Sequence, residues 1–303
     1  MKKRSFFHQV GLFVHPFLHK AVGTVVAVLL PSMALAGTGT SSENRLLPFY
    51  HAHSPNTFAL DVQGAIVNGS IQVRENYLEG TYLSLDDAGI GYAAAVTLEY
   101  TRQFSAVSSI RIPVRFFIER GQHRLSEEVY FNGVRYGTGR PLKSAVHIAD
   151  INFRWERRLI QTSIGADLQF LLGLNLTILS FATDGEVLQA GDMTERFYQQ
   201  VMPLPLLGLN SRFPLNSTAM LCAEIFGFTV NNLNSLRSEG GKVRISQDNL
   251  QTSLALKLLL KPGWYMRSGI RYDYLMINEQ SHEDGNVFHQ SSFGLFARFE
   301  WCP

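Results

Sequence analysis

The chain has few cysteines, and their spacing does not suit a metal site. Only two occur in 303 residues, Cys222 and Cys302, which excludes a disulfide-stapled scaffold and a cysteine-based zinc site. Both fall in segments predicted below to be strands, and whether the two thiols pair stays open. Glycine loops that cradle phosphate groups are also missing, and no cofactor or metal is expected.

An excess of charge is missing as well. The 27 Lys and Arg residues nearly balance the 25 Asp and Glu residues, for a formal net charge of +2, so nucleic acid is not an expected partner. Beyond residue 36 the sequence has no long apolar run, so no membrane helix is predicted there. A composition with 46% hydrophobic residues would suit a soluble protein. The fold class therefore has to come from the residue pattern.

The N-terminal segment has the three parts of a secretory signal. Residues 1–4 are basic, residues 21–30 are apolar, and residues 32–36 supply small side chains at the spacing used for cleavage. We expect a signal peptide over residues 1–36, cut after Ala36, with an uncleaved anchor as the alternative. Residues 37–56 then form a flexible periplasmic lead-in, and residues 57–303 form the folded domain.

Residues 249–277 show the pattern that governs this domain. The positions from Leu250 to Leu260 alternate between an apolar face and a polar face, with Lys257 on the polar one. The turn Lys261-Pro262-Gly263 reverses the chain, and the same alternation resumes from Trp264. Period-two alternation predicts strands, and these strands are about twice the usual ~5–6 residues. Long strands with one apolar face are typical of a transmembrane β-barrel.

Ten such strands are predicted, joined by alternating short and long connections. Their centres lie near Val62, Leu98, Val114, Ile151, Ala166, Gly208, Ala223, Leu256, Ile270 and Ala297. Tight turns are predicted at residues 104–107, 157–160, 214–217 and 261–263, and longer connections at residues 75–90, 120–141, 181–201, 231–247 and 278–290. This alternation indicates an antiparallel up-and-down barrel with short periplasmic turns and five surface loops.

Two of the predicted strands fit the alternation less well. The first changes phase at Asn68-Gly69, which we interpret as a β-bulge. The sixth contains Pro203 and Pro205 near its loop end, where a missing backbone donor does least harm. The segments at 82–85 and 128–136 could be additional strands, so the count stays between eight and twelve.

The last strand carries a family resemblance. Residues 293–301, Phe-Gly-Leu-Phe-Ala-Arg-Phe-Glu-Trp, resemble the C-terminal strand that bacterial outer-membrane β-barrel proteins present to the barrel assembly machinery. The resemblance covers residues 57–303 and implies an outer-membrane location, with membrane lipids, lipopolysaccharide and the assembly machinery as partners. Cys302 and Pro303 follow the final aromatic residue, which departs from the family pattern. A soluble barrel or sandwich with its apolar faces inside remains the alternative.

The polar faces predict a charged barrel interior. The predicted lumen residues are Arg111, Arg115, Arg154, Arg212, Lys257, Arg267, Arg271, Arg298, Glu99, Asp150, Asp167, Glu224 and Asp273. Asp61, Glu119 and Glu156 fall on the same faces. Eight strands are just filled by side chains, and a wide channel needs about sixteen. A near-neutral lumen in ten strands therefore favours a plug of ion pairs, with a narrow porin-like solute channel as the alternative.

One short pattern suggests an enzyme. His289-Gln290-Ser291-Ser292 is similar to the His-x-Ser-Asn motif of outer-membrane lipid A deacylases, in which His acts as base and Ser as nucleophile. Ser292 stands where Asn is expected, and Glu300 lies too far along the strand to orient His289. Outer-membrane proteases also have ten strands, with Asp and His pairs at the rim formed by the loops. His282, Asp284 and His289 are predicted to lie at the corresponding rim of this barrel. We expect solvent-exposed rim residues and no catalytic site.

The connection at 120–141 is the candidate binding surface. Asn132-Gly133 is a strong signal for a two-residue hairpin turn, with Tyr130, Phe131 and Tyr136 around it. These aromatic side chains could contact a ligand, or they could pack the loop over the barrel mouth. The sequence therefore predicts a non-enzymatic barrel with a structural or surface-binding role.

Overall fold

The computed structural model describes residues 55–75, 80–131, 134–183, 197–200, 203–238, 242–281 and 284–303. The predicted signal peptide, nearly all of the lead-in, and His282 lie outside these residues. The strands are β1 (Asn56–Glu75), β2 (Leu83–Ser84), β3 (Tyr92–Ser105), β4 (Ser108–Arg124), β5 (Val129–Phe131), β6 (Val134–Tyr136), β7 (Pro141–Gln161), β8 (Asp167–Thr183), β9 (Phe197–Gln200), β10 (Leu204–Pro214), β11 (Ala219–Ser238), β12 (Lys242–Lys261), β13 (Trp264–Gln280) and β14 (Asp284–Trp301).

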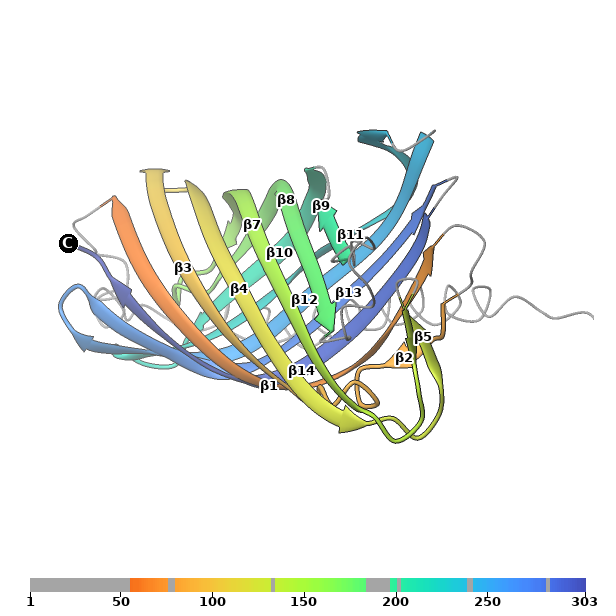
Figure 1. The fold of residues 1–303 in the computed structure, drawn as a ribbon. Coiled ribbons are helices and arrows are strands. Elements are labelled where there is room, and N and C mark those ends of the chain that lie inside the picture. The colour runs from red at the N-terminus through yellow and green to blue at the C-terminus, as the bar shows by residue number, and fades with distance from the viewer. Residues whose placement is uncertain are drawn as a thin grey trace, which may run out of the picture.

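Ten long antiparallel strands form a closed ring (Figure 1). The order runs β10-β11-β12-β13-β14-β1-β3-β4-β7-β8, and pairing of β8 with β10 closes it. Every neighbour pair in this order is antiparallel. The predicted all-β up-and-down barrel of ten strands is confirmed. Among the described residues, no helix is long and apolar enough to cross a membrane.

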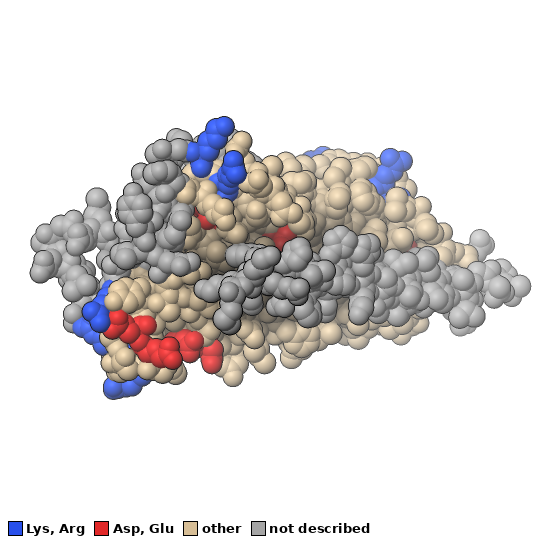
Figure 2. Space-filling view, turned by 90° about the vertical axis from the view of Figure 1, so that its right-hand side faces the viewer, with Lys and Arg blue, Asp and Glu red and all other residues tan. Residues whose placement is uncertain are grey.

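The outward face of the barrel carries an apolar belt. Ile66, Leu98, Phe153 and Leu295 are all exposed on it. On β14 the belt runs from Phe293 to Trp301, which is nine residues and matches the ~9–11 that a tilted membrane strand needs. In Figure 2 most of the visible charged side chains lie toward the ends of the molecule, and the uncovered surface between them is mainly tan.

Aromatic side chains border the belt at the end of the barrel that carries the short turns. Phe58, Tyr100, Trp264 and Trp301 contact one another there, with ring centroids 5.3 to 6.1 Å apart. Aromatic girdles of this kind lie at membrane interfaces. The apolar exterior and polar interior are the organisation of a transmembrane β-barrel. In such barrels the short turns lie at the periplasmic end, and we name the two ends of this barrel accordingly.

The phase change at Asn68-Gly69 is not a bulge. β1 pairs with β14 from Phe58 to Glu75 without a register shift, so the prediction of a bulge was wrong. Side chains still alternate, but their chemistry inverts: Ile66 points outward and is exposed, whereas Val67 and Ile71 point inward and are buried. The strand leaves the lipid at this level, where its outer face meets water and its inner face fills the barrel.

Three predicted connections are also corrected. The turn between β7 and β8 lies at residues 162–166, not 157–160, and Ala166 belongs to it. Thr162 accounts for this position, because its Oγ1 accepts a hydrogen bond from the Ala166 N–H (3.0 Å), and Gly165 supplies a φ of 82°. The predicted loops 231–247 and 278–290 are mainly strand, because β11 to β14 continue pairing beyond the membrane.

Glycines in β1 and β14 give a test of the tight strand packing. A Cβ added at Gly294 would lie 2.1 Å from the Gly64 carbonyl oxygen, whereas one added at Gly64 would meet nothing within 4 Å. We expect Gly294→Ala to lower the free energy of unfolding by roughly 1–3 kcal/mol, the cost of overpacking. Gly64→Ala is the matched control and should stay within about 0.5 kcal/mol of wild type. Urea unfolding in detergent measures both, and equal stabilities would contradict the packing.

Candidate functional site in the barrel lumen

The inward side chains form three levels along the barrel axis. A polar cavity occupies the periplasmic end, buried ion pairs fill the middle, and an apolar core fills the extracellular end. The predicted lumen residues all lie on the inner wall in the first two levels. Alternation along each strand brings these side chains inside, because their neighbours in sequence face the lipid.

The periplasmic and middle levels meet in one connected ion-pair network. Arg111 lies within 3.5 Å of Glu99, 3.0 Å of Glu156 and 2.9 Å of Glu224. Arg154 also pairs with Glu224, at 2.9 Å.

The network continues along β14. The Arg298 guanidinium donates to both oxygens of Glu99, at 2.5 and 2.9 Å, and through Nε to Glu300, at 2.8 Å. Glu300 also accepts from Lys257 Nζ at 2.5 Å. Side chains that lie far apart in sequence are thus joined across the lumen, and each of the four carboxylates in this network has a cationic partner.

A second group of ion pairs lies one level further from the periplasm. Arg115 donates to both carboxylate oxygens of Asp273, at 2.7 and 2.8 Å, and Arg271 donates to both oxygens of Asp61, at 2.7 and 3.1 Å. Gln63 bridges the two pairs by accepting hydrogen bonds from Arg115 and Arg271. Desolvated charges need such partners to remain ionised.

The remaining predicted lumen residues also lie on the inner wall. Asp167 is fully buried and accepts from the Arg212 Nε (2.9 Å) and Nη2 (2.6 Å). Asp150 accepts from the Thr177 hydroxyl at 2.7 Å. Arg267 has no carboxylate partner among the described residues. The sequence alone did not indicate which cation pairs with which carboxylate, because the partners lie on different strands.

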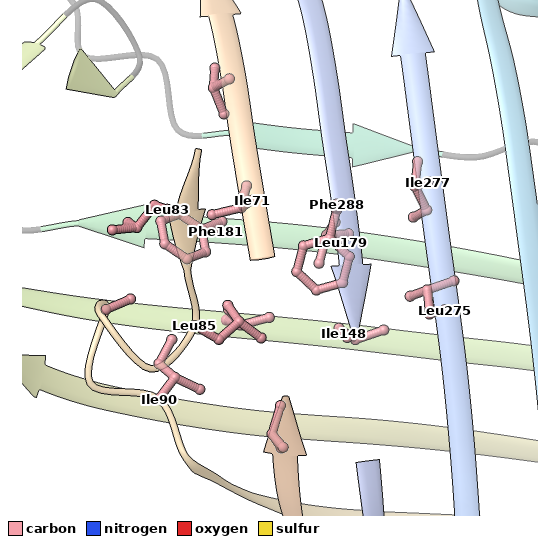
Figure 3. Close-up of a cluster of buried hydrophobic side chains, with 14 of the residues drawn as sticks. Ile71, Leu83, Leu85, Ile90, Ile148, Leu179, Phe181, Leu275, Ile277 and Phe288 are labelled. Atoms are coloured by element: carbon pink, nitrogen blue, oxygen red, sulfur yellow. The ribbon is translucent and has the colours of Figure 1, made fainter. Parts of the chain in front are cut away.

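The extracellular level is an apolar core, which we call the upper core. It joins inward side chains of the barrel wall to side chains from the connections, and Figure 3 shows part of it. Its largest fully buried members are Ile71, Leu83, Leu85, Ile90, Leu142, Leu179, Phe181, Leu204, Ile277 and Phe288. Leu83, Leu85 and Ile90 come from the connection between β1 and β3, which therefore fills the barrel mouth.

The β5–β6 hairpin also contributes to the upper core. Phe131 packs on Phe181 with ring centroids 5.0 Å apart, and Val129 and Tyr136 are buried beside it. Of the three aromatic residues considered as ligand contacts, only Tyr130 is exposed. Phe131 and Tyr136 pack the connection over the mouth instead. Asn132 and Gly133 lie outside the described residues, but the strands that flank them pair as predicted.

The outer side of this hairpin is polar. Arg135 donates to the Glu128 carboxylate at 2.5 Å and lies 5.8 Å from the centre of the Tyr130 ring. The hydrogen bond from Arg135 lowers the pKa of Glu128 from its usual value. These side chains are solvent-exposed and form the surface patch of the barrel mouth.

His289 and Ser291 lie on the outer wall, above the apolar belt. The His289 ring packs edge-on against Tyr274, with centroids 5.3 Å apart, and Ser291 Oγ donates to the Asn68 carbonyl at 3.4 Å. Ser292 faces inward and bonds Asp273. Glu300 is inside the barrel, bound to Lys257 and Arg298. No carboxylate hydrogen-bonds His289 among the described residues, so the described groups do not form a catalytic triad.

Both cysteines line the periplasmic cavity as free thiols. Cys222 is buried, and the Cys302 sulfur lies 3.2 Å from the Thr57 hydroxyl. Within the described residues, no group of three or more His, Cys, Asp and Glu side chains could hold a metal ion.

Comparison with known proteins gives structural neighbours only. No protein family model matches the chain, and no curated protein matches it. Solved structures with a similar fold include the outer membrane protease OmpT from Escherichia coli (9% identity, TM-score 0.48, covering 82% of this chain and 97% of that one). The translocator domain of autotransporter NalP from Neisseria meningitidis (14%, 0.37, 91% and 96%) and the outer membrane protein OprG from Pseudomonas aeruginosa (8%, 0.35, 82% and 98%) are others. What this barrel does therefore has to come from its own residues.

The ion-pair network predicts a large effect for one neutralisation. Glu224→Gln removes the only carboxylate within ion-pair distance of Arg154 among the described residues and leaves that buried cation unpaired. We expect a loss of roughly 3–5 kcal/mol in the free energy of unfolding. Glu128→Gln, at the exposed pair with Arg135, is the control and should leave stability nearly unchanged. Urea unfolding followed by tryptophan fluorescence compares them, and a wild-type midpoint for Glu224→Gln would rule out the network as a stabilising unit.

Proposed function

We propose that this protein is a closed, non-enzymatic outer-membrane barrel with a structural or surface-binding role. Its lumen does not conduct solutes, and its extracellular connections meet the environment. Membrane lipids and lipopolysaccharide surround the apolar belt, and the barrel assembly machinery recognises the C-terminal strand β14. The observation that carries this proposal is the upper core, an apolar seal across the extracellular half of the barrel.

The upper core argues against a conducting path. A hydrophilic solute would have to displace tightly packed apolar side chains, among them Phe181, Phe288 and Leu85, which are almost completely buried. Protein interiors pack as densely as organic crystals, and a hydrophobic constriction excludes ions by dewetting. The extracellular end is therefore closed to water and ions.

The middle of the lumen supplies a second barrier. The cavities between its side chains measure about 30 and 40 Å³, and a buried water needs about 10–15 Å³ on the same measure, so each has room for only a few water molecules. Arg115, Asp273 and Gln63 cross this level through mutual hydrogen bonds. A solute would have to break several buried ion pairs to pass, so side chains close the lumen at two levels.

A surface-binding role rests on the hairpin patch. The inner side of β5–β6 is fixed by the upper core, while Tyr130, Glu128 and Arg135 face solvent. A rigid support with exposed aromatic and charged groups suits recognition of a partner outside the cell, because little conformational entropy is lost on binding.

Planar-bilayer recording tests the closed lumen. Purified wild-type protein should give no conductance steps, because both barriers block the path. Phe131→Ser, which removes a ring from the upper core, should also stay silent, since the ion pairs below it remain. Tyr130→Ser is the control for a change on the exposed side of the same strand. Steady steps from wild-type protein would refute the proposal, and steps from Phe131→Ser alone would show that the upper core is the sole barrier.

Mass spectrometry of lipid A tests the enzymatic alternative built on His289 and Ser291. Cells that overproduce the wild-type protein should contain unchanged lipid A, because Glu300 faces the lumen and cannot orient His289. Ser291→Ala provides the comparison strain. Loss of an acyl chain in the wild-type strain but not in the Ser291→Ala strain would establish a deacylase and overturn the non-enzymatic assignment.

A further inference from the structure

Arg267 differs from the other arginines of the lumen. In the described part of the chain it is the one lumenal arginine without a carboxylate in ion-pair distance. It is only 7% exposed, its Nε has no hydrogen-bond partner, and Nη2 makes one long contact of 3.4 Å with Ser253 Oγ. A guanidinium has five N–H donors, and the contact with Ser253 is the one hydrogen bond that the described residues make with it. Its Cζ also lies 5.9 Å from the centre of the Phe296 ring.

The immediate neighbours of Arg267 are also cations. On the inner wall it lies directly opposite Lys257 on β12 and Arg298 on β14. Like charges that face each other across strands are unfavourable. Lys257 and Arg298 form close ion pairs with Glu300 and Glu99, whereas the middle member of this row has no carboxylate within ion-pair distance among the described residues.

The ion-pair network around Arg267 is already balanced. It joins four cations to four carboxylates and so has a formal charge of zero: Arg111, Arg154, Lys257 and Arg298 with Glu99, Glu156, Glu224 and Glu300. Arg267 is a further cation at this level, and Glu224 and Glu300, which already pair with other cations, attract it only from beyond ion-pair distance. An anionic group placed against its guanidinium would supply the close counter-charge that it lacks.

Arg267 lines a cavity with room for such a ligand. The cavity measures about 390 Å³ and is bordered by the β3–β4 turn, by Cys302 and by Arg111, Lys257 and Arg298. One water molecule occupies about 30 Å³, so a small hydrated anion fits. The turn and the C-terminal residues lie at the periplasmic end, which makes the periplasm the source of the ligand.

We propose that Arg267 is the centre of a binding site for a small oxyanion, a phosphate or carboxylate group, in the periplasmic cavity. The planar guanidinium matches two oxygens of such a group. Lys257 and Arg298 raise the local positive potential on either side. This site is independent of the surface role proposed above, because the ion pairs and the upper core separate the cavity from the extracellular face.

Nuclear magnetic resonance of the full barrel in a maltoside detergent, which carries no phosphate, tests the site directly. With ¹⁵N-labelled arginine, inorganic phosphate should shift one Nε–H signal in a saturable way. Arg267→Lys identifies that signal by its loss. A parallel titration with acetate distinguishes the two oxyanion classes. If neither phosphate nor acetate shifts the Arg267 signal, the site does not exist.

Thermal unfolding of matched variants supplies the second measurement. Phosphate should raise the unfolding temperature of wild-type protein, and Arg267→Gln should weaken this effect at least tenfold without lowering the unfolding temperature in phosphate-free buffer. Lys261→Gln, an exposed lysine at the same end of the barrel, makes the same charge change and should respond like wild type. Arg267→Lys keeps the charge but loses the planar guanidinium that can bind two oxygens at once. This variant should also bind phosphate at least tenfold more weakly. Wild-type affinity in either Arg267 variant would overturn the proposal.

Discussion

Backbone hydrogen bonding in hydrocarbon is the constraint on which this structure depends. No water is available there to satisfy N–H and C=O groups, so the sheet must close on itself, and pairing of β8 with β10 completes the ring. The closed ring then divides space into three environments for side chains: lipid outside, water beyond the membrane, and the lumen. In each stretch of strand, the residue types on the two faces match the environments that those faces meet.

The strands are longer than the membrane requires, and this explains the inversion of their pattern. β1 has 20 residues and β7 has 21, whereas a membrane strand needs about 9–11. The extra length projects beyond the lipid, where Ile71 and Val73 turn inward and are buried and Asn68 is exposed. Apolar side chains buried inside this projecting part of the wall stabilise it in the absence of lipid. Each Å² of apolar area removed from water contributes roughly 25 cal/mol. The upper core is thus a consequence of strand length.

Sequence alternation predicted the barrel, the strand count and the charged lumen, because the contrast between the faces is strong where lipid lies outside. It failed where the contrast reverses or weakens. The apolar face changes sides at Asn68-Gly69, and this change was interpreted as a bulge. The outer faces of β11 to β14 are polar beyond the membrane, and these segments were therefore predicted to be loops. Periodicity reports environment, not pairing, and a continuous backbone ladder crosses both boundaries. The cationic surroundings of Arg267 could not be predicted either, since they depend on which strands become neighbours.

The two halves of the lumen are filled differently. Apolar side chains close the extracellular half, whereas the periplasmic half contains a polar cavity. The extracellular half excludes water by apolar packing, so only the outer side of the connections meets the exterior. The periplasmic half keeps a cavity, because charged side chains there repel or pair at fixed distances and do not pack as densely as the upper core. A ligand from the periplasm reaches Arg267 without disturbing the seal, and a partner at Tyr130 leaves the cavity unchanged. The ion pairs between them hold ten strands in one register and keep the two surfaces separate.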